Sequence, residues 1–114
     1  MSDSSIPLTT GEWEEWGNPN YQVFFDYMKK YSPYNNLKND YYPNLLLRTG
    51  LNDYRVGYWE PTKFLAKFRD NNNNDTISLL KVDMNKGHSN SLDFHERIKE
   101  EAFKIAFIFK TLGF

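Results

Sequence analysis

The chain has no cysteine, which excludes disulfide bonds and thiolate metal sites. Neither sign of charge is in excess: 14 basic and 15 acidic residues leave a net charge of −1, so composition favours neither nucleic acid nor a membrane surface as a partner. No apolar run approaches the roughly 18 residues of a membrane span. The first residues, MSDSSIPLTT, carry neither a basic start nor an apolar signal core. These absences favour a cytoplasmic protein.

Aromatic residues are abundant, at 18% of the chain. Such side chains bury large areas, so they need partners to pack against. Residues 12–42 mix aromatics with acids and turn formers, and we expect a helix there only around Tyr21 to Tyr31. At 114 residues, the chain has the length of about one small domain.

The pattern becomes regular after Tyr42. Short apolar runs at residues 45–47 and 77–82 predict two strands buried on both faces, as in a parallel sheet. A helix with one apolar stripe should follow each strand. The first stripe is Pro61, Phe64, Leu65 and Phe68, and the second is Phe94, Ile98, Ala102, Ile105 and Phe109. Asp93 and Glu96 have the spacing of a capping box for the last helix. This order predicts a parallel α/β fold with right-handed crossovers.

Two side chains that carry chemistry follow the predicted strands. Asp53 lies just after the first strand and His88 just after the second. Open parallel sheets place their active sites beyond the carboxyl ends of their strands, so the two side chains could meet there. The carboxylate would then accept the imidazole Nδ1 proton and orient the ring as a general base. From the residues alone, Asp53 as a turn former and His88 as a surface histidine stay open as alternatives.

Other polar residues give weaker signals. Glu12 and Glu14, in GEWEEWG, have the pattern of a solvated loop when they are considered by themselves. His88, Asp93 and His95 do not have the spacing of metal ligands. The sequence therefore predicts no metal and no cofactor.

Four segments carry a resemblance to a known family. They are IPLTTGEWEEWGNP, YSPYNN, YPNLLLRTGLNDYRVGYWEPTKFLAKFR and MNKGH. In this order they resemble the C-terminal end of the catalytic domain in the oligopeptidase B branch of the prolyl oligopeptidase family of serine peptidases. The resemblance implies the C-terminal portion of an α/β-hydrolase domain with an incomplete sheet, from an enzyme that also carries a β-propeller and a Ser, Asp, His triad.

The resemblance also implies roles for five residues. Asp53 would be the orienting acid of the triad, and His88 its general base. Glu12 and Glu14 would bind the arginine or lysine before the cleaved bond, since carboxylates suit the donors of a guanidinium. Arg55 matches the position of a substrate-binding arginine in prolyl oligopeptidase.

Some features depart from the pattern of the family. The nucleophile of these enzymes lies in a G-x-S-x-G elbow, and this sequence contains none. Asn52 stands where many relatives have histidine, and Ser89 and Asn90 stand where they have glycines. We therefore expect a C-terminal fragment that supplies two of the three triad members and is inactive alone, because His88 would have no hydroxyl proton to take.

Three functional interpretations follow. The first is part of a serine endopeptidase that cuts short peptides after Arg or Lys, with the missing N-terminal part of the same enzyme as its partner. The second is an inactive module that still binds basic peptides through Glu12 and Glu14. The third is a non-functional remnant. A G-x-S-x-G elbow and propeller repeats encoded upstream would separate the first from the other two.

Overall fold

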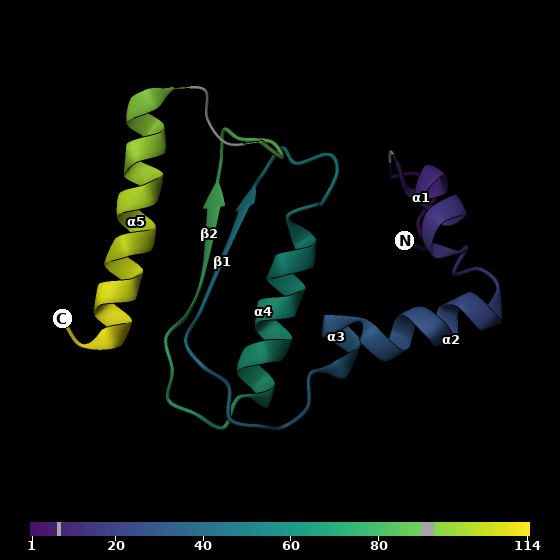
Figure 1. The fold of residues 1–114 in the computed structure, drawn as a ribbon, viewed down its shortest axis with the longest axis horizontal. Coiled ribbons are helices and arrows are strands. Elements are labelled where there is room, and N and C mark those ends of the chain that lie inside the picture. Colours follow the sequence, from purple (N-terminus) through teal and green to yellow (C-terminus); the bar gives the residue numbers. More distant parts are fainter. Residues whose placement is uncertain (7, 90–92) are drawn as a thin grey trace. The chain divides into compact units, whose positions relative to one another are not determined.

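The computed structural model describes residues 1–6, 8–89 and 93–114 of the chain. Pro7 and residues 90–92 lie outside the described residues, and so does the departure from the family pattern at Asn90. The chain forms two compact units, residues 1–39 and residues 40–114. Each unit has its own set of elements (Figure 1).

The described residues of the first unit form three helices, α1 (Thr9–Trp16), α2 (Gln22–Tyr31) and α3 (Pro33–Asn36). The helix expected around Tyr21 to Tyr31 is confirmed as α2. The expectation of no other helix in residues 12–42 was wrong, because α1 covers most of GEWEEWG and α3 is a further short helix.

Helix α1 was not predicted because its local sequence signals are weak. Its N-cap residue is Leu8, which makes no side-chain hydrogen bond to the first turn, and Gly11 lies inside the helix. An uncapped start and an internal glycine each weaken a helix pattern. The C-terminal end of α1 has a clearer sequence signal, the glycine at position 17. Gly17 has a φ of 91°, which favours glycine, and its N–H donates to the carbonyl of Trp13.

The second unit is built on two parallel strands, β1 (Leu45–Gly50) and β2 (Ser78–Asp83). Their register runs from Leu45 beside Ser78 to Gly50 beside Asp83. The prediction of two parallel strands is confirmed. Their expected burial on both faces is not seen within this chain, since the three leucines of β1 are half-buried and Leu79 is 40% exposed.

Helix α4 (Trp59–Asn71) connects the two strands and packs against both. Leu65 and Phe68, two residues of the predicted stripe, are buried, and the Phe68 ring lies 5.0 Å from the ring of Tyr42. Pro61 lies in the first turn, where a missing N–H costs no hydrogen bond. The prediction for this helix is confirmed.

Helix α5 (Phe94–Leu112) ends the chain. The side chain of Asp93 caps it by accepting a 2.8 Å hydrogen bond from the N–H of Glu96, as the capping-box spacing predicted. Figure 1 shows α4 and α5 on either side of the strand pair. No helix among the described residues is long and apolar enough to cross a membrane.

The predicted buried stripe of α5 was wrong. Its members are exposed, and Phe109, for example, is 53% exposed. The inward face instead holds the buried Glu100 and the half-buried Phe103 and Phe107. Apolar residues occur on several sides of α5, so periodicity did not single out one face. The contacts of Glu100 and Phe103 with the strands decide which face is turned inward.

The isolated 114-residue chain should fold poorly. Leu65 and Phe68 are the only large apolar side chains that are buried among the described residues, while many aromatic and aliphatic side chains are exposed. A two-stranded sheet also leaves strand edges unpaired. We expect ANS binding and a broad, weakly cooperative thermal transition. A monodisperse monomer with a sharp two-state melt would contradict this expectation.

Candidate active site

The loops that follow β1 and β2 are held together by their backbones. The N–H of Leu51 donates to the carbonyl of Asp83 at 2.8 Å, and the N–H of Asn52 donates to the carbonyl of Lys86 at 3.0 Å. Gly50 permits this approach, because a side chain there would overlap the backbone of Lys86 and Gly87. The parallel register therefore brings the segments before Asp53 and His88 side by side.

The Asp53 carboxylate is fixed by its own loop. Its Oδ1 accepts hydrogen bonds of 2.9 Å from the backbone N–H groups of Arg55 and Val56. Its side chain is only 9% exposed. Two donors from a tight turn hold one oxygen in place, which leaves the other oxygen free to face a further partner.

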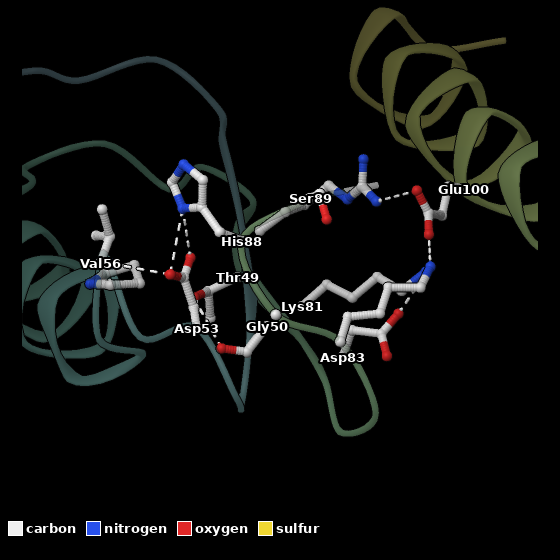
Figure 2. Close-up of a pocket in the computed structure, with 13 residues that line it drawn as sticks. Thr49, Gly50, Asp53, Val56, Lys81, Asp83, His88, Ser89 and Glu100 are labelled. Atoms are coloured by element: carbon white, nitrogen blue, oxygen red, sulfur yellow. Dashed lines mark hydrogen bonds and ion pairs between the residues drawn. The ribbon is translucent and has the colours of Figure 1, made fainter. Parts of the chain in front are cut away.

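That partner is His88. Its Nδ1 lies 2.9 Å from Oδ2 and 3.2 Å from Oδ1 of Asp53. Figure 2 shows the imidazole directly facing the carboxylate. Because an ionised carboxylate only accepts hydrogen bonds, this contact selects the ring form that carries a proton on Nδ1. The His88 side chain is 43% exposed, so the ring is accessible from solvent.

The environment of Asp53 favours its ionised form. Burial is the largest single influence, and it acts to raise the pKa of Asp53. The N–H of Val56, the His88 ring and the N–H of Arg55 act in the opposite direction. Together they outweigh burial and hold the pKa below the ordinary value of 3.8. Asp53 is therefore negatively charged at neutral pH, the state in which its carboxylate accepts a hydrogen bond from the Nδ1–H of His88.

Asp53 and His88 line a cavity with a volume of about 380 Å³. A network of charged side chains around Glu100 lies on the other side of this cavity (Figure 2). Glu100 is 5% exposed and pairs with Arg48 at 3.0 Å and with Lys86. Lys86 also pairs with Asp83 at 3.1 Å. Sequence reasoning missed Glu100, because it stands beside Glu101 in a run of charged residues and has the pattern of a surface acid.

The side chains of the other residues singled out in the sequence have surroundings of their own. Glu12 and Glu14 belong to α1, in the other compact unit, where they line different pockets of about 520 and 440 Å³. Residues two apart on a helix point to different sides, so the structure does not bring these two carboxylates together. Arg55 is exposed, and its guanidinium lies 5.8 Å from the centre of the Tyr54 ring.

No group of three or more His, Cys, Asp or Glu side chains is arranged to hold a metal ion within the part of the chain that the structure describes. The Asp–His pair is the arrangement in this cavity that matches a known catalytic geometry. An imidazole that is oriented by a carboxylate and accessible from solvent is the arrangement of a general base.

Comparison with known proteins gives the class to which this arrangement belongs. Residues 1–114, the whole chain, match the prolyl oligopeptidase family. The chain belongs to this family of serine peptidases, as its sequence motifs predicted.

Two curated relatives align over nearly the whole chain. The chain is 44% identical over 113 residues to Protease 2 of Moraxella lacunata. It is 41% identical over 113 residues to dipeptidyl aminopeptidase BI of Pseudoxanthomonas mexicana. Each alignment covers 99% of this chain but only 16% of the relative. The chain thus spans about a sixth of the length of these proteins.

Solved structures of oligopeptidase B resemble the fold. The enzyme from Leishmania major matches with a TM-score of 0.91 at 48% identity, over 97% of this chain and 15% of that one. The enzyme from Trypanosoma brucei, with covalently bound antipain, matches with a TM-score of 0.90 at 49% identity, over 97% of this chain and 16% of that one. These matches confirm the predicted α/β-hydrolase fold.

The lowered pKa of Asp53 predicts a pH dependence that can be measured in a restored enzyme. We define the restored enzyme as Protease 2 of Moraxella lacunata in which the 113 aligned residues are replaced by this chain. An ionised Asp53 stabilises the folded state above its unfolded pKa, and this contribution is lost as the pH falls through the lower folded pKa. The restored enzyme should therefore melt at a higher temperature than its Asp53→Asn variant at neutral pH.

The difference between these melting temperatures should persist at about pH 5 and shrink only below the ordinary value of 3.8. Thermal melts of both proteins across this range make the comparison. A difference that has already vanished at about pH 5 would show that the carboxylate is not held in its ionised form.

Proposed function

We propose that this chain supplies the general base and the orienting acid of a serine endopeptidase of the oligopeptidase B type. The observation that carries the proposal is the contact of 2.9 Å between Asp53 and the Nδ1 of His88 at the carboxyl ends of two parallel strands. The membership of the chain in a family of serine peptidases supports it.

In the proposed mechanism, a serine hydroxyl from a part of the enzyme outside this chain attacks the peptide carbonyl. The Nε2 of His88 takes the hydroxyl proton as the bond to the carbonyl carbon forms, and later donates it to the leaving amine. Asp53 stays ionised throughout, holds the proton on Nδ1 and stabilises the imidazolium. Its three hydrogen-bond partners fix the carboxylate before substrate arrives, so the orientation of the ring needs no rearrangement during the reaction.

The proposed substrates are short peptides with Arg or Lys before the cleaved bond. Glu12 and Glu14 would bind that basic side chain, and because the two residues line different pockets, the single variants described below test whether each carboxylate takes part. Glu12 lines a pocket together with Trp16 and Phe25, and Glu14 lines another together with Trp13 and Phe24. Carboxylates beside apolar walls suit a guanidinium, which is weakly hydrated and stacks on aromatic faces. Arg55 is proposed as a further substrate-binding residue. The enzyme is proposed to act in the cytoplasm without a cofactor.

Substitution of the base tests the triad assignment in the restored enzyme. His88→Ala should lower kcat/KM by several orders of magnitude, because no other group accepts the hydroxyl proton. Asp53→Asn should cost about 10⁴-fold or less, because the imidazole remains but takes the wrong tautomer. Hydrolysis of a fluorogenic peptide ending in Arg-Arg measures both. The chain by itself serves as the control and should release no fluorophore.

Equal activity of the restored enzyme and its His88→Ala variant would refute the assignment. His95→Ala is the matched control, since it removes an exposed imidazole from the first turn of α5 and should leave kcat/KM unchanged.

Substrate specificity is tested separately. In the restored enzyme, Glu12→Ala combined with Glu14→Ala should raise KM by about 10-fold or more for peptides with Arg or Lys before the cleaved bond, because the bound cation would lose its partners. Asp26→Ala is the matched control, since Asp26 is an exposed acid of the same unit that lines neither pocket, and it should leave KM unchanged. The two single variants show whether both carboxylates contribute. An unchanged KM in the double variant would contradict the proposed specificity site.

A further inference from the structure

Glu100 is the most deeply buried acidic residue among the described residues, at 5% exposure. It reaches from the middle of α5 toward the strand pair, where its Oε2 lies 3.0 Å from Arg48 and its Oε1 contacts Lys86. A buried carboxylate is costly to desolvate, and its removal from water is compensated only when partners of opposite charge are held around it. Two cations surround Glu100, one for each of its oxygens.

The two cations belong to the two segments that carry the Asp–His pair. Arg48 lies on β1, five residues before Asp53, and Lys86 lies in the loop after β2, two residues before His88. One carboxylate on a third element thus contacts both segments that must stay aligned. Figure 2 shows Glu100 across the cavity from Asp53 and His88, with its contacts directed to other side chains.

Lys86 connects the ion pairs around Glu100 with the loop that carries His88. Its ammonium pairs with Asp83 at 3.1 Å as well as with Glu100, and its carbonyl accepts the 3.0 Å hydrogen bond from Asn52, the neighbour of Asp53. Lys86 and His88 are separated by a single residue, Gly87, so His88 stays close to wherever Lys86 is held. Anchoring Lys86 therefore limits where the His88 ring can go.

We infer that Glu100 is a positioning residue, which holds Arg48 and Lys86 so that His88 stays aligned with Asp53 during proton transfer. This inference rests on the proposed function of the pair. A variant without Glu100 still has the imidazole of His88 and the carboxylate of Asp53, but the loop that carries His88 can move. A displacement of about 1 Å at a reacting group is enough to cost about 100-fold in rate.

The test uses Glu100→Gln in the restored enzyme, because glutamine keeps the shape of the side chain and removes its charge. Active sites are first counted with a serine-directed phosphonate, so that kcat refers only to folded, competent enzyme. We expect kcat per active site to fall by about 10- to 100-fold while KM changes by less than about 2-fold. A loss of stability alone would lower the number of active sites without changing kcat per site.

Glu101→Gln is the matched control. Glu101 is the next residue of α5, is exposed, and forms an ion pair of 2.6 Å with Lys104. The substitution changes the net charge by the same amount at nearly the same place. It should leave both kcat and KM unchanged, and an equal fall in kcat in this variant would overturn the inference, because the effect would then be one of charge alone.

Lys86→Met is the second variant, which keeps the test decisive if Glu100→Gln does not fold. It releases the histidine loop while the pair between Arg48 and Glu100 remains. We expect a similar loss of kcat per active site, and we expect the double variant to be no slower than Glu100→Gln, because the two residues act together. Wild-type kcat per site in the folded single variants, or losses that multiply in the double variant, would overturn the inference.

Failure of the inference can be distinguished from failure of the proposed function. If the restored enzyme is active and His88→Ala abolishes that activity, the proposed function stands, and unchanged kcat in Glu100→Gln overturns only the role of Glu100. If His88→Ala is as active as the restored enzyme, the proposed function fails first, and the inference fails with it.

Discussion

The parallel pairing of β1 with β2 is the constraint on which the site depends. Parallel strands end at the same edge of a sheet, so the loops that leave them start side by side. The hydrogen bonds from Leu51 to Asp83 and from Asn52 to Lys86 continue that pairing beyond the strands. Gly50 leaves the space that the two backbones need. The contact between Asp53 and His88 is the consequence of this arrangement, because each side chain leaves its loop just beyond the paired segment.

Electrostatic interactions then stabilise the two loops that the backbone hydrogen bonds hold side by side. The Asp53 carboxylate has three donors and is held ionised in a partly buried position, which is the state that orients an imidazole. On the opposite side of the cavity, Glu100 is buried between two cations from the same two segments. The two acids differ in what they contact. Asp53 contacts His88, the proposed base, whereas Glu100 contacts Arg48 and Lys86.

Prediction from sequence succeeded where the signal was local. The spacing of Asp93 and Glu96 specified the start of α5, and the apolar stripe from Pro61 to Phe68 specified the buried face of α4. The same rules failed for α1, which has no capping side chain and contains a glycine, and for the inward face of α5. In α5 the apolar residues lie on several sides of the helix, so the periodicity allowed the buried face to be assigned to the wrong side. The face that is turned inward depends on Arg48 and Lys81, which are distant in sequence and contact Glu100 and Phe103.

The sequence by itself determined the family, the alternation of strands and helices, and the two loops that carry Asp53 and His88, because motifs, periodicity and capping are properties of neighbouring residues. Only the tertiary structure decided that these two side chains meet at 2.9 Å, that backbone N–H groups hold the carboxylate, and that Glu100 is buried between Arg48 and Lys86. Glu100 and Glu101 are the same residue type and neighbours in the sequence, yet Glu100 is buried and Glu101 is exposed to solvent. Which one is buried depends on partners that folding brings from other elements, and no local pattern encodes their distance.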